Sequence, residues 1–229
     1  RLDGEWEFHW GKLLEPPFPP VSGVPGGVSS IRVPRPWNEA MLDDRFLPGK
    51  GHATFRLRVL TRDNSRVLGI KLNQVLMAGK VFIDDSPVGT IGLVGTGPAG
   101  MVSQRRVGLF FFRPAHPSFN ITIQVSNYHY IKGGIKGSIE LGYAESLQSS
   151  RETLLAFDLF LLGSLLIIAL YHFGLYIFRR RDFPVLFFGV FCLLFATRSL
   201  LTGEIPLTVL FPDIDWMLMI RWELLNLYL

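Results

Sequence analysis

The chain has 229 residues, of which 48% are hydrophobic and only 18% are charged, and its formal net charge is +4. This composition excludes intrinsic disorder, which requires low hydrophobicity and high net charge. It also disfavours an ordinary soluble domain, in which about 25% of residues are charged. Residues 1–153 hold 18 of the 23 Lys and Arg residues, and residues 154–229 hold the other five. The sequence therefore predicts a soluble half joined to a membrane half.

Residues 1–146 are predicted to form an all-β domain, because they contain short alternating segments separated by Gly, Pro and Asp. The longest segments are 52–60 and 119–125, and in each of them apolar side chains occupy every second position. Further segments of this kind are 6–10, 31–33, 67–72, 81–83, 88–91, 107–112 and 138–143. Many short strands favour an antiparallel sandwich or jelly roll over a parallel α/β sheet. Five prolines between positions 16 and 25 predict a loop over residues 15–30.

The second half contains three apolar runs that are predicted to be transmembrane helices, at 154–178, 183–201 and 216–229. Helices of the first two lengths reach across a hydrocarbon core of about 30 Å, whereas the third is too short and is expected to continue beyond the sequence. Arg179, Arg180 and Arg181 lie between the first two runs, and residues 202–215 contain no Lys or Arg. The positive-inside rule therefore predicts that the arginine turn is cytoplasmic and that residues 1–146 lie outside the cytoplasm.

Asp158 and Arg198 are ionisable residues near the outer ends of the first two predicted helices. Those ends are neighbours in an antiparallel hairpin, so the sequence allows an intramembrane Asp158–Arg198 ion pair. The alternative is that both side chains lie in the interfacial region and are solvated.

We expect ligand-binding residues near predicted turns of the β domain, because aromatic side chains on loops often stack on sugar rings. For Trp37 the core is the more common location in a small sandwich, and this alternative stays open. The candidates are Trp37, Asn127, Tyr128, His129, Tyr130 and Lys132.

Other classes of site have little support. The single cysteine, Cys192, excludes an intrachain disulfide and a thiolate metal cluster, and the five histidines lack zinc-binding spacing. Residues 95–100 match G-x-G-x-x-G, but Pro98 interrupts the motif and no helix is predicted after it, so we interpret it as a loop. The basic residues form no stripe of the kind that binds nucleic acid. The sequence thus indicates no metal, no cofactor and no nucleic-acid partner.

Seven segments carry a resemblance to a known family. They are LDGEWEFHWG at 2–11, VPRPWN at 33–38, GHATFRLRV at 51–59, VSNYHYIKGGIKGSIELG at 125–142, LFLLGSLLIIALYHFGLYIFRRRD at 159–182, LLTGE at 200–204 and the ending RWELLNLYL. In these segments the chain resembles the bacterial seven-transmembrane receptors with diverse intracellular signalling modules, the DISM-type receptors. The outer half alone also resembles the sugar-binding jelly-roll domain of β-galactosidase-type glycosidases, which shares the LDGxW opening, the VPxxW turn and the GxxxFR strand.

This resemblance implies a multi-pass protein of the bacterial inner membrane with a periplasmic or extracellular, galactose-binding-like sensor domain. It implies a small-molecule ligand, with a carbohydrate as the favoured class, and a downstream cytoplasmic signalling domain as partner besides the lipid bilayer; a homodimer is left open. No enzymatic output module is expected within residues 1–229. The alternative function is a membrane-tethered carbohydrate-binding or glycosidase-like protein, which would need two carboxylates about 5–10 Å apart around a sugar site.

Overall fold

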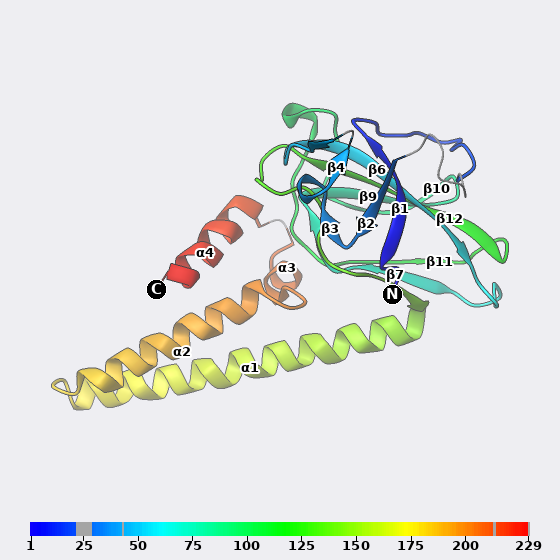
Figure 1. Ribbon diagram of the computed structural model, residues 1–229. Coiled ribbons are helices and arrows are strands. Elements are labelled where there is room, and N and C mark those ends of the chain that lie inside the picture. The colour runs from blue at the N-terminus through cyan, green and yellow to red at the C-terminus, as the bar shows by residue number, and fades with distance from the viewer. Residues whose placement is uncertain (22–28, 43, 213, 229) are drawn as a thin grey trace. The chain divides into compact units, whose positions relative to one another are not determined.

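The computed structural model describes residues 1–21, 29–42, 44–212 and 214–228 (Figure 1). The chain divides into two compact units, Arg1–Leu147 and Gln148–Leu229, which are described separately here. Part of the predicted 15–30 loop and the last residue of the predicted third helix lie outside the described residues. Residues 15–21 of that loop contain no strand, as the prolines predict, whereas residues 29 and 30 lie in a strand that begins at Ser29, so the predicted end of the loop is wrong.

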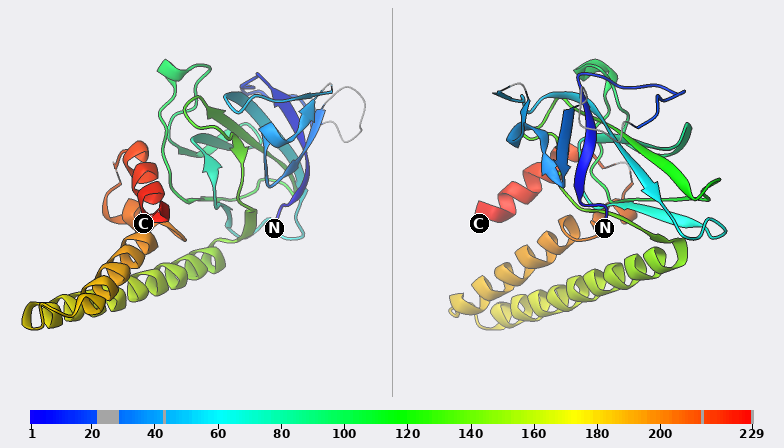
Figure 2. Two further views of the ribbon diagram at one scale, coloured as in Figure 1. Left: turned by 60° about the vertical axis from the view of Figure 1, so that its left-hand side comes forward. Right: turned by 45° about the vertical axis from the view of Figure 1, so that its right-hand side comes forward.

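The first unit is an all-β sandwich, and this confirms the predicted fold class. Its largest sheet has six antiparallel strands in the order β10-β9-β12-β6-β1-β2. Two three-stranded sheets, β11-β7-β14 and β3-β13-β8, and the small hairpin β4–β5 complete the unit (Figures 1 and 2). The strands are β1 Gly4–Trp10, β2 Ser29–Val33, β3 Arg35–Pro36, β4 Met41–Leu42, β5 Arg45–Phe46, β6 Gly51–Leu60, β7 Leu68–Leu72, β8 Val75–Leu76, β9 Ala78–Ile83, β10 Ser86–Ile91, β11 Gly108–Phe112, β12 Ser118–Asn127, β13 Gly134–Ile135 and β14 Ile139–Tyr143.

The centre of the large sheet is the long pair β6–β12, whose register runs from Ser118 opposite Leu60 to Asn127 opposite Gly51. The alternation predicted from the sequence sets which side of this pair meets the core, since Phe55, Ile121 and Ile123 are fully buried there. The side chains of the smaller sheets cover them from the other layer. The buried core residues of that layer are Leu68, Ile70, Leu72, Val75, Phe112, Ile135 and Ile139.

The short strands β3, β8 and β13 form a sheet that the sequence pattern does not reveal. Each has only two residues, so no alternation can be recognised within it. They pair through Gly134 with Pro36 and Leu76, and this sheet brings the loop before β13 next to the loop after β3.

The second unit is helical. The two long apolar helices, α1 (Ala144–Phe178) and α2 (Phe183–Leu201), run side by side as an antiparallel hairpin (Figures 1 and 2). They are followed by α3 (Pro206–Leu210) and α4 (Trp216–Tyr228), and α2 packs against α3 and α4. α1 begins ten residues before the predicted start at Leu154, and its 35 residues span about 52 Å. Both α1 and α2 are long and apolar enough to cross a membrane.

Candidate functional site

The side chain of Asn127 organises the β12–β13 loop from inside the protein. It is fully buried, and its Nδ2 group donates hydrogen bonds to the carbonyl oxygens of Gly49 (2.7 Å), Tyr130 (2.8 Å) and Lys132 (3.0 Å). Its Oδ1 atom accepts a hydrogen bond from the Tyr130 N–H at 2.9 Å. Every polar atom of the amide is therefore used to hold two loops in place.

Trp37 begins the short 3-10 helix η1 (Trp37–Glu39) and is also fully buried. Its ring packs edge-on against Trp10, with centroids 5.2 Å apart, and is stacked at 6.5 Å on Phe55. The indole Nε1–H donates to the carbonyl oxygens of Pro48 (3.0 Å) and Gly49 (3.2 Å). Burial and satisfied hydrogen bonds give Trp37 and Asn127 a structural role, and their contact with a ligand stays a prediction.

Tyr128 is half-buried at the base of the same loop. Its hydroxyl lies 2.6 Å from the Thr96 carbonyl oxygen and 2.6 Å from His52 Nδ1. A carbonyl oxygen can only accept, so the tyrosine donates to it and the Nδ1–H of His52 donates to the hydroxyl. Burial raises the pKa of Tyr128, which therefore stays neutral and keeps its proton as a donor.

His129 and Lys132 are the exposed members of the predicted set, and Tyr130 is half-buried between them. His129 Nδ1 lies 3.1 Å from the hydroxyl of Ser103, and the Lys132 ammonium lies 2.8 Å from a carboxylate oxygen of Glu39. The hydrogen bond from Lys132 holds the pKa of Glu39 below its usual range, and Glu39 in turn raises the pKa of Lys132. This solvent-exposed pair is fully charged at neutral pH.

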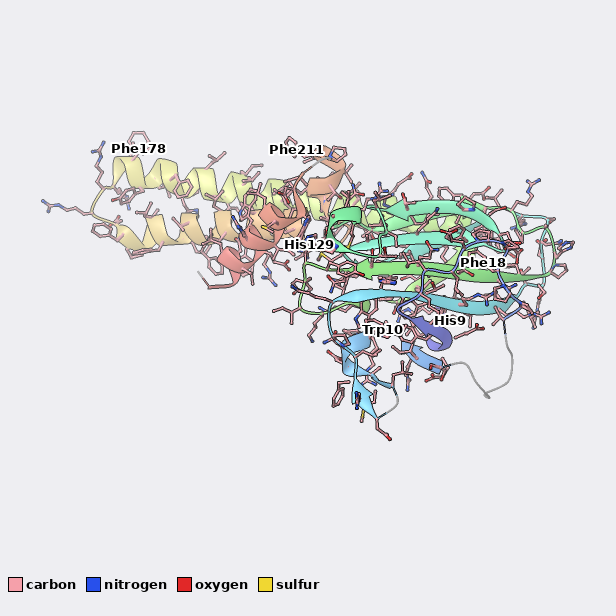
Figure 3. The ribbon with its side chains drawn as sticks, turned by 90° about the horizontal axis from the view of Figure 1, so that it is seen from above. His9, Trp10, Phe18, His129, Phe178 and Phe211 are labelled. Atoms are coloured by element: carbon pink, nitrogen blue, oxygen red, sulfur yellow. The ribbon has the colours of Figure 1, made fainter. Side chains whose placement is uncertain are left out.

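These groups come from three loops and from His52 at the start of β6, and we call them the loop-end surface. It consists of Glu39, His52, Thr96, Ser103, Tyr128, His129, Tyr130 and Lys132. The label of His129 in Figure 3 marks this surface, well apart from His9 and Phe18. Four of the six predicted residues are therefore brought together, on a base made by the other two.

The loop-end surface combines aromatic rings, an imidazole, a hydroxyl, an ammonium and a carboxylate. Such a mixture can stack on the apolar face of a small polar molecule and exchange hydrogen bonds with its hydroxyl groups. Within the described residues, no group of three or more His, Cys, Asp or Glu side chains is placed to hold a metal ion.

In the helical unit, Asp158 of α1 contacts the turn that follows α2. Its Oδ2 atom accepts a hydrogen bond from the Glu204 N–H at 3.3 Å. Gly203 has a φ of +66°, and a Cβ atom there would lie 2.6 Å from the same carboxylate oxygen, so this turn requires glycine. Arg151 lies about two helical turns before Asp158. Its Nε atom is 3.5 Å from Glu204 Oε2. Two side chains of α1 thus hold the α2–α3 turn.

Asp158 and Arg198 do not form the expected ion pair in the part of the chain that the structure describes. Arg198 is exposed on the last turn of α2, whereas Asp158 lies level with the turn beyond the end of that helix. The two helices of the hairpin are therefore offset from the alignment that the predicted helix ends implied. The Asp158 carboxylate accepts a hydrogen bond from the Glu204 N–H and does not pair with Arg198.

We expect Asp158→Ala to lower the free energy of unfolding of the helical unit by about 1 kcal/mol, because the buried Glu204 loses a hydrogen-bond acceptor. Arg198→Ala is the matched control and should change it by less than about 0.5 kcal/mol. Thermal unfolding of the full chain in detergent, followed by size-exclusion chromatography, measures both. Equal losses, with no further loss in the double variant, would show instead that the two side chains act as a pair.

One polar contact between helices was not predicted from the sequence. The Thr197 hydroxyl of α2 donates to Asn226 Oδ1 of α4 at 3.0 Å, and Asn226 Nδ2 donates to the Trp222 carbonyl at 2.9 Å. The signal for it was a polar residue in each apolar run, since hydrogen bonds between such residues join membrane helices. The sequence alone does not reveal which polar residues meet.

The helical region of the chain is similar to a known family. Residues 154–229 match the family model described as 7TM diverse intracellular signalling. No curated protein matches the chain at a significant level.

Solved structures similar to the chain include glycoside hydrolases. A GH2 β-galacturonidase from Eisenbergiella tayi is 15% identical, with 60% of this chain and 23% of that chain covered and a TM-score of 0.40. A β-glucuronidase from Ruminococcus gnavus is 11% identical over 61% of this chain and 28% of that chain, with a TM-score of 0.42. A GH2 member from Bacteroides cellulosilyticus is 15% identical over 61% and 20%, with a TM-score of 0.45.

This chain thus spans about a quarter of the length of those enzymes, and the family assignment comes from its helices alone. Two apolar helices of membrane-spanning length and a matching family model agree with each other. The protein is a membrane protein, and its residues 154–229 are similar to the family described as 7TM diverse intracellular signalling.

Proposed function

We propose that this receptor senses a small carbohydrate ligand at the loop-end surface of its sandwich and signals through the helices to a cytoplasmic output domain. The observation that carries the proposal is that helices of a signalling family follow, in one chain, a folded sandwich with a polar and aromatic surface at the end of its loops. The affinity of the receptor for the ligand must differ between two arrangements of its helices, because a ligand that binds both equally does not shift the equilibrium between them.

The helix α1 supports a mechanical connection between sensing and signalling. It begins at Ala144, directly after Tyr143, the last residue of β14. The Leu147 side chain lies next to Gly69 of β7 and Gly142 of β14, so the first turn of α1, which belongs to the first unit, packs on the sandwich. In this proposal a shift of β14 is passed on along α1, which follows it in the sequence without an intervening loop.

The proposed orientation follows from charge. Arg179, Arg180 and Arg181 form the turn between α1 and α2, and the α2–α3 turn contains no Lys or Arg. By the positive-inside rule the arginine turn faces the cytoplasm, and the sandwich lies on the periplasmic or extracellular side of the bacterial inner membrane. Labelling of single cysteines placed at Arg180 and at Arg62, in a Cys192→Ala background, tests this: a membrane-impermeant reagent should reach only position 62 in intact cells.

The ligand is tested by thermal unfolding of the full chain in detergent with D-galactose, D-glucose, D-mannose and N-acetylglucosamine. A ligand at about 100 times its Kd stabilises the folded state by about 2.7 kcal/mol and must raise Tm. His129→Ala combined with Lys132→Ala should abolish this shift, and the exposed control Arg62→Ala should retain it. A shift that survives the double variant, or no shift with any sugar, contradicts the proposal. Turnover of a nitrophenyl glycoside would support the glycosidase-like alternative.

A further inference from the structure

The outer face of the six-stranded sheet, opposite the core, carries an unusually dense set of polar side chains. Their alignment follows from the strand registers, which place residues of four adjacent strands in rows. The first row is Glu7, Arg56, Thr122 and Phe82, and the second is His9, Thr54, Gln124 and Lys80. We call these eight residues the sheet-face cluster. None of them belongs to the loop-end surface, and His9 lies well apart from His129 (Figure 3).

Residues 12–20, here called the strap, cover this face. Thr54 Oγ1 donates to the Lys12 carbonyl at 2.8 Å, and Gln124 Nε2 donates to the Leu14 carbonyl at 2.5 Å. Arg56 also donates to a strap carbonyl, that of Pro19. Three side chains of the cluster thus direct their donors at oxygen atoms of a chain segment that forms no strand with the sheet.

An aromatic contact fixes the other end of the strap. The Phe18 ring packs edge-on against Phe82, with centroids 5.2 Å apart, and lies 5.8 Å from the Arg56 guanidinium carbon. The Phe18 N–H donates to Asp85 Oδ1 at 2.8 Å, at an exposed site. The strap is therefore held by one aromatic side chain and a few hydrogen bonds, and Phe82 beneath it offers an aromatic ring on the sheet face.

Two polar atoms at the centre of the cluster have no hydrogen-bond partner among the residues that the structure describes. They are Arg56 Nε and Thr122 Oγ1, and both side chains are fully buried. The two residues are directly opposite each other on β6 and β12, so their side chains are cross-strand neighbours on one face. Buried polar groups nearly always have partners, and a pair without them marks a place where an oxygen atom of another molecule would be stabilised.

The charges of the cluster favour an anion. Arg56 and Lys80 are cationic, and the only carboxylate in the two rows is that of Glu7, which lies 3.2 Å from Arg56 Nη1 and 2.6 Å from His9 Nε2. Lys80 lies 4.8 Å from the Phe82 ring centroid. A guanidinium is always charged, and its planar donors match the two oxygens of a carboxylate.

We propose that the sheet-face cluster is a second ligand site, for a saccharide that carries a carboxylate, and that the strap occupies it in this structure. Arg56 and Thr122 bind the carboxylate, Thr54 and Gln124 bind hydroxyl groups in place of the strap carbonyls, and Phe82 stacks on the sugar ring as Phe18 leaves. The site is independent of the loop-end surface, and its failure leaves the proposed sensing of a neutral sugar untouched.

Isothermal titration in detergent of the full chain carrying His129→Ala and Lys132→Ala, which removes the proposed loop-end site for neutral sugars, tests the proposal with sodium D-galacturonate, D-galactose and sodium acetate. We expect galacturonate to bind at least tenfold more tightly than either control. Thr122→Val replaces an unpartnered hydroxyl by a methyl group of the same size, so the sandwich should fold, and galacturonate binding should weaken at least tenfold. Thr153→Val makes the same change on an exposed turn of α1 and should alter binding less than twofold.

Phe18→Ala provides a test that does not depend on weakening the site. Loss of the Phe18 ring loosens the strap, and galacturonate should bind at least threefold more tightly. The proposal is overturned if galacturonate does not bind the Phe18→Ala variant, if galactose binds equally well, if Thr122→Val leaves binding intact, or if His129→Ala abolishes it.

Discussion

Replacing Asn127 by Ala is expected to lower the free energy of unfolding of the sandwich by about 3–5 kcal/mol. The variant leaves three carbonyl oxygens and the Tyr130 N–H without their partner, at a side chain that is fully buried. Each buried polar group without a partner costs about 1–3 kcal/mol, and part of this cost is recovered when water enters the loosened loop. Urea denaturation of the full chain in detergent, followed by tryptophan fluorescence, measures the change.

The control for this variant is Asn120→Ala. Asn120 lies on the same strand, β12, and is half-buried. Its backbone makes the contacts with Asp84: the N–H donates to Asp84 Oδ1 at 2.8 Å, and the carbonyl oxygen accepts from the Asp84 N–H at 2.8 Å. The change should be within about 0.5 kcal/mol. If Asn127→Ala cost no more than Asn120→Ala, the loop would be held by other contacts, and the amide of Asn127 would be free for a ligand.

Trp37→Ala is expected to destabilise the sandwich by about 3–5 kcal/mol, the range for removing a large aromatic side chain from a core. The cavity would lie between Trp10 and Phe55, and the carbonyl oxygens of Pro48 and Gly49 would lose a shared donor. Trp37→Phe retains the ring contacts and loses only the donor and part of the area, so its cost should be about 2 kcal/mol.

The same urea denaturation measures both variants, since Trp6 and Trp10 still report on the sandwich. Sugar binding gives the contrast: a core residue affects binding only through stability, so Trp37→Phe should bind sugars like the unaltered chain under conditions where it is folded. A variant that keeps its stability but loses sugar binding would restore Trp37 as a ligand contact.

The two residues show where prediction from the sequence ended for this site. The position of Trp37 and Asn127 near turns suggested a ligand surface, and turns do meet there. Their burial depends on the loop at Pro48 and Gly49, which is 11 or 12 residues from Trp37 but 78 residues from Asn127 in the sequence. This loop reaches Asn127 through the register of β6 and β12, which places Asn127 opposite Gly51. Alternation predicts each strand but not the register between two strands, so the neighbours of the Asn127 side chain could not be predicted.

In the helical unit, composition was sufficient to locate the two long helices but not to align them. A long run of apolar residues predicts a membrane-spanning helix. The first ten residues of α1, from Ala144, are mostly polar, so the apolar pattern does not show that the helix begins there. The partner of Asp158 depends on the offset between α1 and α2, which is set by side-chain packing such as that of Gly189 beneath the Phe173 ring.

The sequence by itself determined the sandwich, the apolar helices and the side of each long strand that meets the core. Alternation carries that information locally, because successive side chains of a strand point to opposite faces. What happens to the other face was decided only by the tertiary structure. Thr54, Arg56 and Gln124 alternate with core residues as solvent-facing side chains do, yet all three are buried. The strap that covers them comes from a segment 37 to 110 residues away, and contacts over such separations are made only when the chain folds.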